Sequence, residues 1–241
     1  MISCVADAGV GKSRLIHEFL NSKASKDIGN FFSIGHASNI SSQPYYLFAT
    51  LIKDIFKISE VDSADISKKK INTKIKEIEK FTKISLSDCL PFIGFLIGVK
   101  YKDDRLNDRQ EIQNNINISV RTLMESICQF TNQQDKPYIF ILDDFHWIDK
   151  MSLDLLVFLF STFDFKNKNK NKNMSYPLFL TTFRSHYEIP QNLLNEIDYT
   201  QLDLKPLTKD HSIDLINYLT RKIQITKVKK MELYDKSRGN P

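Results

Sequence analysis

The sequence predicts an α/β fold in which helices flank a central parallel sheet, and three observations support this class. Short apolar runs typical of strands alternate with segments that have helical spacing of apolar residues. The run that leads to Asp143 is continuously apolar and ends in carboxylates, as in a central strand buried on both faces. The first run, Ile2–Ala6, passes through a glycine-containing loop into an amphipathic helix. This order favours parallel strands with right-handed helical crossovers.

The first half of the chain begins with two strands and continues in helices. We expect strands at Ile2–Ala6 and Phe31–His36, a helix with an apolar face of Leu15, Ile16, Phe19 and Leu20, and a helix at Pro44–Phe56 that opens on a proline. Residues 63–131 have no convincing strand pattern and form a predicted helical insertion. Apolar residues recur there at helical spacings in two runs, namely Ile71, Ile75, Ile78 and Phe81, then Ile112, Ile116, Ile118, Leu123 and Ile127.

The second half of the chain returns to alternating strands and helices. The expected elements are a strand at Pro137–Asp144, a helix at Ser152–Phe160, a strand at Tyr176–Phe183, a short helix at Ile189–Ile197, a strand at Tyr199–Leu204 and two helices at Lys209–Ile223 and Lys227–Lys236. Residues 1–205 therefore form the predicted core, with the helical insertion inside it. Residues 206–241 form a short helical extension.

The composition is that of an ordinary globular protein. The chain has 241 residues, of which 41% are hydrophobic and 26% charged, enough for one sizeable core and a helical extension. The longest apolar stretches, Leu90–Val99 and Leu155–Phe160, are shorter than the roughly 18 residues that a membrane helix needs. No secretory signal follows Met1. We therefore expect a cytoplasmic protein without a membrane partner.

Cysteines, histidines and basic residues show no clustering typical of a metal or nucleic-acid site. Three cysteines and five histidines lack the spacings of disulfide frameworks or zinc sites. The net charge of +5 includes four lysines that alternate with asparagine in Lys166–Asn173, inside a predicted surface loop at 164–175. No aromatic residues interleave with these lysines as a stacking platform requires, so a nucleic-acid partner is not favoured.

The loop after the first strand carries a phosphate-binding motif, Ala6-Asp-Ala-Gly9-Val-Gly11-Lys12-Ser13. Its pattern is the P-loop G-x-x-x-x-G-K-[ST], with Ala6 in place of the first glycine. Backbone amides of such a loop converge on phosphates, and the following helix adds a favourable dipole. Lys12 would reach the β- and γ-phosphates, and Ser13 would ligate Mg²⁺. The residues expected to bind nucleotide here are Ala8, Gly9, Val10, Gly11, Lys12, Ser13 and Arg14.

A second motif, Asp143-Asp144-Phe-His-Trp147-Ile-Asp149, follows the continuously apolar strand. Ligands of parallel α/β sheets bind at the carboxyl ends of strands, so Asp143 is expected to hold Mg²⁺ through water. Asp144 would orient or deprotonate the attacking water. The alternative is a solvated acidic turn that caps the next helix, and for Asp149 a helix cap is an equally good interpretation. His146 and Trp147 are interpreted as packing residues.

The next strand ends in Leu180-Thr-Thr182-Phe-Arg184. A cation at that position would face the γ-phosphate beside Asp143 and report which nucleotide is bound. A lone arginine after a strand is weak evidence without the two other motifs. The expected catalytic residues are accordingly Lys12, Asp144 and Arg184.

These motifs together resemble the AAA-type ATPase module of the STAND class of signal-transduction NTPases, as in MalT-type regulators and regions attached to some adenylyl cyclases. The segments that carry the resemblance are Ala8–Leu15, Pro44–Phe48, Leu90–Phe92, Leu142–Asp149, Thr182–Arg184, Leu202–Thr208 and Gly239–Pro241. It implies that Lys12 and Ser13 bind phosphate and Mg²⁺, that Arg184 senses the γ-phosphate, and that Pro241 packs near the adenine. It also implies ATP, since no guanine signature is present.

Two departures from the family pattern lead us to expect a truncated core. Family members have a segment before the first strand that helps to enclose the adenine, whereas only Met1 precedes Ile2 here. The family also continues into a lid and into effector or repeat domains where this chain stops at Pro241. Residues 206–241 would then be the start of that lid. Effector or repeat domains of a longer parent chain are the expected partners, together with nucleotide-dependent oligomers.

The function expected from these observations is a regulatory nucleotide switch that binds ATP and hydrolyses it slowly. A degenerate scaffold that binds nucleotide without turnover is the main alternative. A P-loop phosphotransferase would need an acceptor pocket, which the helical insertion can in principle supply. A DNA-engaged AAA ATPase would need a basic DNA-binding domain, and salt-sensitive DNA binding would indicate it.

Overall fold

A computed structural model describes the chain except residues 28, 30, 83, 164–175, 222 and 224. Its centre is a parallel sheet with the strand order β2-β3-β4-β1-β5. The strands are β1 (Ile2–Val5), β2 (Phe32–His36), β3 (Ile139–Asp143), β4 (Leu178–Phe183) and β5 (Thr200–Asp203). The predicted fold class is confirmed, with all five strands where the sequence places them. The predicted loop at 164–175 lies outside the described residues.

Alternating side chains of the strands separate the core into two hydrophobic clusters, one on each face of the sheet. Phe140, Leu142 and Phe179 point to the larger cluster, where helices cover them. Ile139 and Ile141 point to the smaller cluster, which they share with Ile16 of α1 (Lys12–Asn21). The strands are therefore apolar on both faces, as parallel strands between two helical layers must be.

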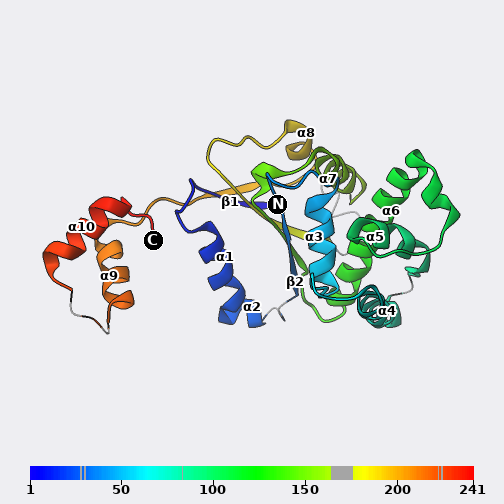
Figure 1. Ribbon diagram of the computed structural model, residues 1–241, viewed down its shortest axis with the longest axis horizontal. Helices are drawn as coiled ribbons and strands as arrows, with labels where there is room; N and C mark the ends of the chain where they lie inside the picture. Colours follow the sequence, from blue (N-terminus) through cyan, green and yellow to red (C-terminus); the bar gives the residue numbers. More distant parts are fainter. Residues whose placement is uncertain (28, 30, 83, 164–175, 222, 224) are drawn as a thin grey trace.

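The helices divide unequally between the two faces (Figure 1). One face carries α3 (Tyr46–Ile55) and α7 (Lys150–Phe163) and, beyond them, α4 (Ala64–Phe81), α5 (Leu90–Ile97) and α6 (Arg109–Asn132). The other face carries α1, followed by the short α2 (Lys23–Asp27), which the sequence pattern does not predict. The helical insertion is thus continuous with the main core, since buried residues of α4, α5 and α6 pack in the same cluster as the sheet.

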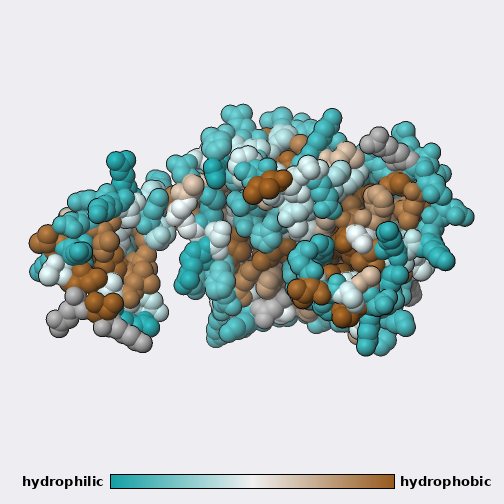
Figure 2. All heavy atoms as spheres, in the orientation of Figure 1, coloured by the Kyte–Doolittle hydropathy of each residue, from teal (hydrophilic) through white to brown (hydrophobic). Residues whose placement is uncertain are grey.

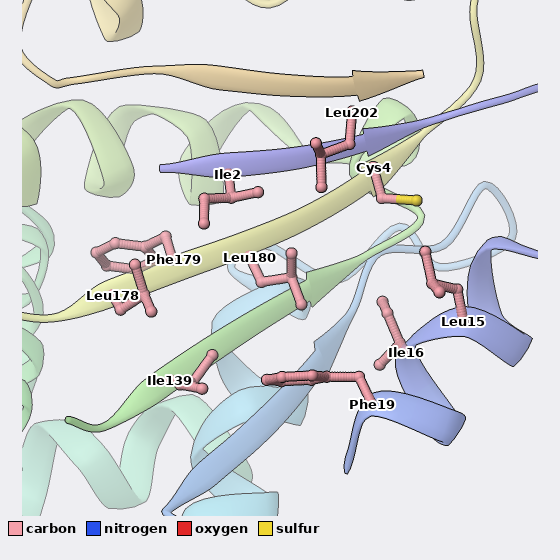
Figure 3. A pocket seen from close by; sticks show the side chains of 10 residues that line it. All are labelled: Ile2, Cys4, Leu15, Ile16, Phe19, Ile139, Leu178, Phe179, Leu180 and Leu202. Carbon is pink, nitrogen blue, oxygen red and sulfur yellow. The ribbon is translucent and has the colours of Figure 1, made fainter. Parts of the chain in front are cut away.

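An apolar groove of about 300 Å³ remains on the face that α1 covers (Figure 3). Figure 3 shows Ile2 and Leu180 on the strands and Phe19 on α1 among the side chains that line it. Leu15, expected on the buried face of α1, lies at this groove and is 42% exposed, because no further helix in the described structure covers this part of the sheet. The edge strand β5 is exposed along its whole length for the same reason.

Two helices after the sheet, α9 (Lys209–Leu219) and α10 (Lys227–Ser237), pack against each other at one end of the molecule, beyond α1 (Figure 1). The amide of Leu207 donates to the carbonyl of Gly239 at 2.8 Å, which closes the pair at its base. Aliphatic side chains are exposed on this pair and on the segment between its helices, where Figure 2 shows brown patches; they are Leu219, Ile223, Val228 and Leu233. The ring of Tyr218 is exposed there as well.

The predicted helix at Ile189–Ile197 is shorter in the structure, where α8 covers only Gln191–Leu194. Pro190 precedes its first residue, and Leu193 and Ile197 anchor the segment in the core without a second helical turn. The three cysteines are buried free thiols. Throughout the described residues, every helix is too short or too polar to span a lipid bilayer.

Candidate functional site

The glycine loop joins β1 to α1 and has left-handed backbone where the motif has its glycines. The φ angles are 83° at Gly9 and 109° at Gly11. Residues that carry a Cβ atom rarely adopt such φ angles, so glycine is favoured at both positions. Ala6 is outside this region, and its amide donates to the carbonyl of Phe183, which extends the sheet by one bond. Alanine therefore replaces the usual first glycine without backbone strain.

Lys12 lies across the base of the loop, with its ammonium group held by backbone oxygens. Nζ donates to the carbonyl of Ala6 at 2.7 Å and to that of Asp7 at 3.0 Å. The residue is only 9% exposed. Among the described residues no carboxylate lies within ion-pairing distance of Nζ, so its charge is left for an anion.

A cavity of about 330 Å³ opens on this loop and joins it to the ends of β3 and β4. It is lined by Ala8, Gly9, Gly11, Lys12, Ser13, Arg14, Asp144 and Arg184. Most of the predicted site residues are thus brought together. Val10 is buried and does not line the cavity, and neither Asp143 nor Pro241 is among its lining residues.

Residues at the end of the chain pack against the outside of the glycine loop. A Cβ atom on Gly11 would lie 3.4 Å from Cγ of Pro241, and one on Gly9 would lie 3.2 Å from Nδ2 of Asn240. Pro241 is therefore close to the loop, although far from it in sequence.

Asp143 is fixed by two side chains from the neighbouring strands β2 and β4. Its Oδ1 accepts from the Thr182 hydroxyl at 2.5 Å, and its Oδ2 lies 3.4 Å from Nδ1 of His36. Burial by itself would raise the pKa of Asp143, but the hydrogen bonds from His36 and Thr182 outweigh burial and lower it. The same contact with Asp143 raises the pKa of His36. The carboxylate is therefore charged and rigidly placed at neutral pH.

Asp144 turns away from the strand and into the cavity. Its φ angle is 54°, and its amide donates to Oγ1 of Thr182 at 2.9 Å. Aspartate tolerates this left-handed conformation better than most residues. Thr182 thus bonds to both members of the acidic pair, accepting from the backbone of one and donating to the side chain of the other.

Arg184 follows β4 and lies on the same cavity. Its guanidinium carbon is 5.8 Å from the centre of the Trp147 ring, a cation–π contact. The next residue, Ser185, donates a hydrogen bond from its hydroxyl to Asp7 of the glycine loop. The end of β4 is therefore linked to the loop.

Asp149 caps two helices, and the structure favours this interpretation over a catalytic one. Its Oδ1 accepts from the amides of Ser152 in α7 and of Tyr45 before α3, both at 2.9 Å. Its Oδ2 accepts from the Ser152 hydroxyl at 2.6 Å. Asp149 therefore joins segments 104 residues apart in sequence.

A model of the AAA ATPase domain matches residues 1–169 of the sequence. The chain belongs to this family. Comparison with curated proteins gave no match. Membership implies nucleotide binding and suggests ATPase activity, and AAA ATPase domains typically bind ATP with Mg²⁺.

The residues around the glycine loop of this AAA ATPase domain have the chemistry needed to bind both a nucleotide phosphate and Mg²⁺. The left-handed glycines permit the tight turn that lets backbone amides of such a loop converge on phosphate oxygens, and Lys12 supplies a charge that no carboxylate in the described residues neutralises. Ser13 and Asp143 carry oxygen donors that could hold a metal ion. Mg²⁺ is usually held by one or two protein oxygens together with substrate phosphates, so the chemistry of these two side chains fits that ion. The described residues contain no cluster of three or more acidic, histidine or cysteine side chains.

The sequence motifs assign no role to four polar residues near the cavity, namely Asp7, His36, Thr182 and Ser185. His36 and Thr182 stand at the carboxyl ends of strands that flank Asp143, with His36 opposite Asp143 in the register. Polar residues at the ends of predicted strands were the available signal, but the strand order needed to use it follows only from tertiary structure.

Proposed function

We propose that this AAA ATPase domain is a regulatory nucleotide switch of the STAND class that binds ATP and hydrolyses it slowly. The observation that carries the proposal is the convergence of Lys12, Asp144 and Arg184 on one cavity beside the glycine loop. Two cations bind the negative charge of a polyphosphate, and the carboxylate activates water. These three residues come from different elements, and the fold alone brings them together.

The glycine loop would bind the phosphates through its amides and through Lys12. In this proposal the nucleotide contacts extend over Ala8–Arg14, and Pro241 lies by the adenine. Ser13 and Asp143 would hold Mg²⁺, which supplies charge neutralisation at the β- and γ-phosphates when bound. The two hydrogen bonds on Asp143 favour this role, because they keep the carboxylate charged and fix its position.

Asp144 is the residue we assign to orient the attacking water and accept its proton. Its neighbour Asp143 is engaged by His36 and Thr182, whereas the Asp144 carboxylate is exposed on the cavity. A base must reach the water without being occupied by other donors. Arg184 would contact the γ-phosphate. A movement of Arg184 on loss of that phosphate would reach the glycine loop through the hydrogen bond between Ser185 and Asp7.

We further propose that residues 1–205 form the ATPase core and that residues 206–241 begin the lid. The base of the α9–α10 pair, closed by Leu207 and Gly239, supports a boundary near residue 205. The exposed hydrophobic side chains of this pair support contact with further domains. The effector or repeat domains of a longer parent chain, in the cytoplasm, are the proposed partners, with nucleotide-dependent oligomers as one outcome.

Isothermal titration of Mg·ATP and Mg·ADP into the chain and into Lys12→Ala tests binding. We expect the wild type to bind nucleotide and Lys12→Ala to lose binding, because the variant removes the ammonium group that backbone oxygens hold at the base of the loop. Lys76→Ala, which changes an exposed lysine of α4, is the matched control and should bind as wild type. Unchanged binding in Lys12→Ala would overturn the phosphate site.

Release of phosphate from ATP by wild type and by Asp144→Asn tests turnover. We expect the variant to bind ATP normally and to lose at least about 100-fold in rate, the range for removal of a general base. Asp235→Asn on α10 is the control. Wild-type binding without any phosphate release would instead identify a nucleotide-binding scaffold, and equal rates in Asp144→Asn would refute the base assignment.

A further inference from the structure

The indole of Trp147 makes a cation–π contact with Arg184, one of the residues that line the cavity. The guanidinium carbon lies 5.8 Å from the ring centre, and Trp147 as a residue is 39% exposed. Of the contacts described for the guanidinium, none is an ion pair with a carboxylate. The ring is therefore the surface that orients this long side chain.

The position of the Trp147 ring is set by the short turn that carries it and by a neighbouring histidine ring. Trp147 ends the short 3-10 turn Phe145–Trp147, whose first residue is fully buried, and its amide donates to the carbonyl of Asp144 at 2.9 Å. The His146 ring packs on the indole with centres 4.9 Å apart, and His186 meets His146 edge-on at 6.3 Å. The turn that directs Asp144 into the cavity thus also sets the position of Trp147.

A guanidinium stacked on an aromatic face keeps its N–H donors free at its edge. That edge can bind a phosphate while the face remains on the ring. Stacking also limits the rotamers of the arginine before any ligand arrives, so less side-chain entropy is lost on binding. His146 is half-buried, and its ring nitrogens are shielded from solvent without a hydrogen-bond partner, so its contact with the indole is a packing contact between rings.

We propose that Trp147 is a positioning residue that holds the Arg184 guanidinium ready for the γ-phosphate and so contributes to discrimination between ATP and ADP. The inference deepens the proposed function and rests on it. It assigns to Trp147 a role that packing alone does not require. Loss of the ring should weaken binding of a triphosphate by about two- to tenfold, the equivalent of ordering one flexible side chain, and leave the diphosphate unaffected.

The first experiment needs no nucleotide. Trp147 is the single tryptophan of the chain, so its fluorescence reports this ring alone. Acrylamide should quench it more strongly in Arg184→Ala than in wild type, because the guanidinium no longer shields one face. Arg221→Ala is the matched control, since Arg221 stacks in the same way on Tyr218, at 4.6 Å. Equal quenching in Arg184→Ala and wild type would overturn the stacking.

The second experiment measures the affinities of Mg·ADP and of a non-hydrolysable Mg·ATP analogue by titration calorimetry. Trp147→Leu and Trp147→Phe are the paired variants, because both keep an apolar side chain and only phenylalanine keeps an aromatic face. We expect Trp147→Leu to lose affinity for the analogue alone and Trp147→Phe to retain most of it. In Arg184→Ala the further change Trp147→Leu should have no effect, since the residue it positions is already gone.

Three results would refute the inference. An equal loss of affinity for both nucleotides in Trp147→Leu would mean a structural role for the ring, and unchanged affinity for both would mean that the ring has no role in binding. Additive effects of the two substitutions would show that Trp147 acts independently of Arg184. Failure of the proposed function would give a different result. The wild type would then bind neither nucleotide, whereas the difference in acrylamide quenching between Arg184→Ala and wild type would still be observed.

Discussion

Substitution of Thr182 by valine removes the hydroxyl that connects the two acidic residues and keeps the shape of the side chain. The residue is fully buried, donates to Asp143 at 2.5 Å and accepts from the amide of Asp144 at 2.9 Å. A hydrogen bond to a charged group contributes about 1.5–3 kcal/mol, and a neutral hydrogen bond such as that from the Asp144 amide contributes about 0.5–1.5 kcal/mol. Burial of the added methyl group offsets about 1 kcal/mol of this loss. We expect a net destabilisation of about 1–3.5 kcal/mol.

Urea unfolding followed by circular dichroism measures this change, and thermal unfolding should show a Tm lower by about 2–14 °C for a chain of this size. Thr181→Val is the matched control. Thr181 is equally buried in the same strand, but its hydroxyl is paired with the neutral Ser3 hydroxyl at 2.6 Å. Loss of a neutral bond should cost about 0.5–1.5 kcal/mol, clearly less than the loss at Thr182.

The effect of Thr182→Val should also depend on pH. The folded-state pKa of Asp143 is lowered, so its contribution to stability is present above the unfolded-state pKa and is lost as the pH falls through the folded-state value. The difference between wild type and variant should therefore be largest near neutral pH and shrink in acid. Equal destabilisation by Thr181→Val and Thr182→Val, with no narrowing in acid, would refute the reasoning.

Three further substitutions test other parts of the structure. Asp149→Ala should lower the free energy of unfolding by about 2–4 kcal/mol in urea titrations, because three hydrogen bonds that cap two helices are lost, whereas Asp235→Ala should leave it nearly unchanged. His36→Ala should destabilise the protein at pH 5–6 and cease to do so as the pH rises through the raised pKa of His36, which unfolding at a series of pH values would show. Gly35→Ala should cost at least about 2 kcal/mol by calorimetry, since its Cβ would lie 2.8 Å from the carbonyl oxygen of Leu47; a smaller cost would mean that α3 moves away freely.

Much of the fold could be predicted because its signals are local. Strand-like runs, helical spacings and the glycine loop are each read within a window of a few residues, and the five strands lie where those windows place them. The residues at which helices begin and end were less predictable. The helix expected to open at Pro44 begins at Tyr46, because Tyr45 adopts a left-handed conformation with its amide bonded to Asp149, far away in sequence.

The candidate site was predictable in its residue types but not in its connections. Lys12 and Ser13 stand in one contiguous motif, so their proximity needs no long-range information. The placement of Arg184 beside Asp144 depends on β3 and β4 being neighbours, which a sequence of alternating strands and helices suggests but does not specify. The contact between Arg184 and Trp147 is a matter of side-chain packing, and no sequence pattern predicts it.

The α/β class, the order of the elements and the glycine loop can be predicted from the sequence, because periodicity and glycine placement act through the backbone of neighbouring residues. The strand order, the contacts of Asp143 with His36 and Thr182, and the capping role of Asp149 become visible only in the folded chain. These features depend on the pairing of distant segments in three dimensions. A pairing of that kind is selected by the packing of the whole core, and no local pattern contains it.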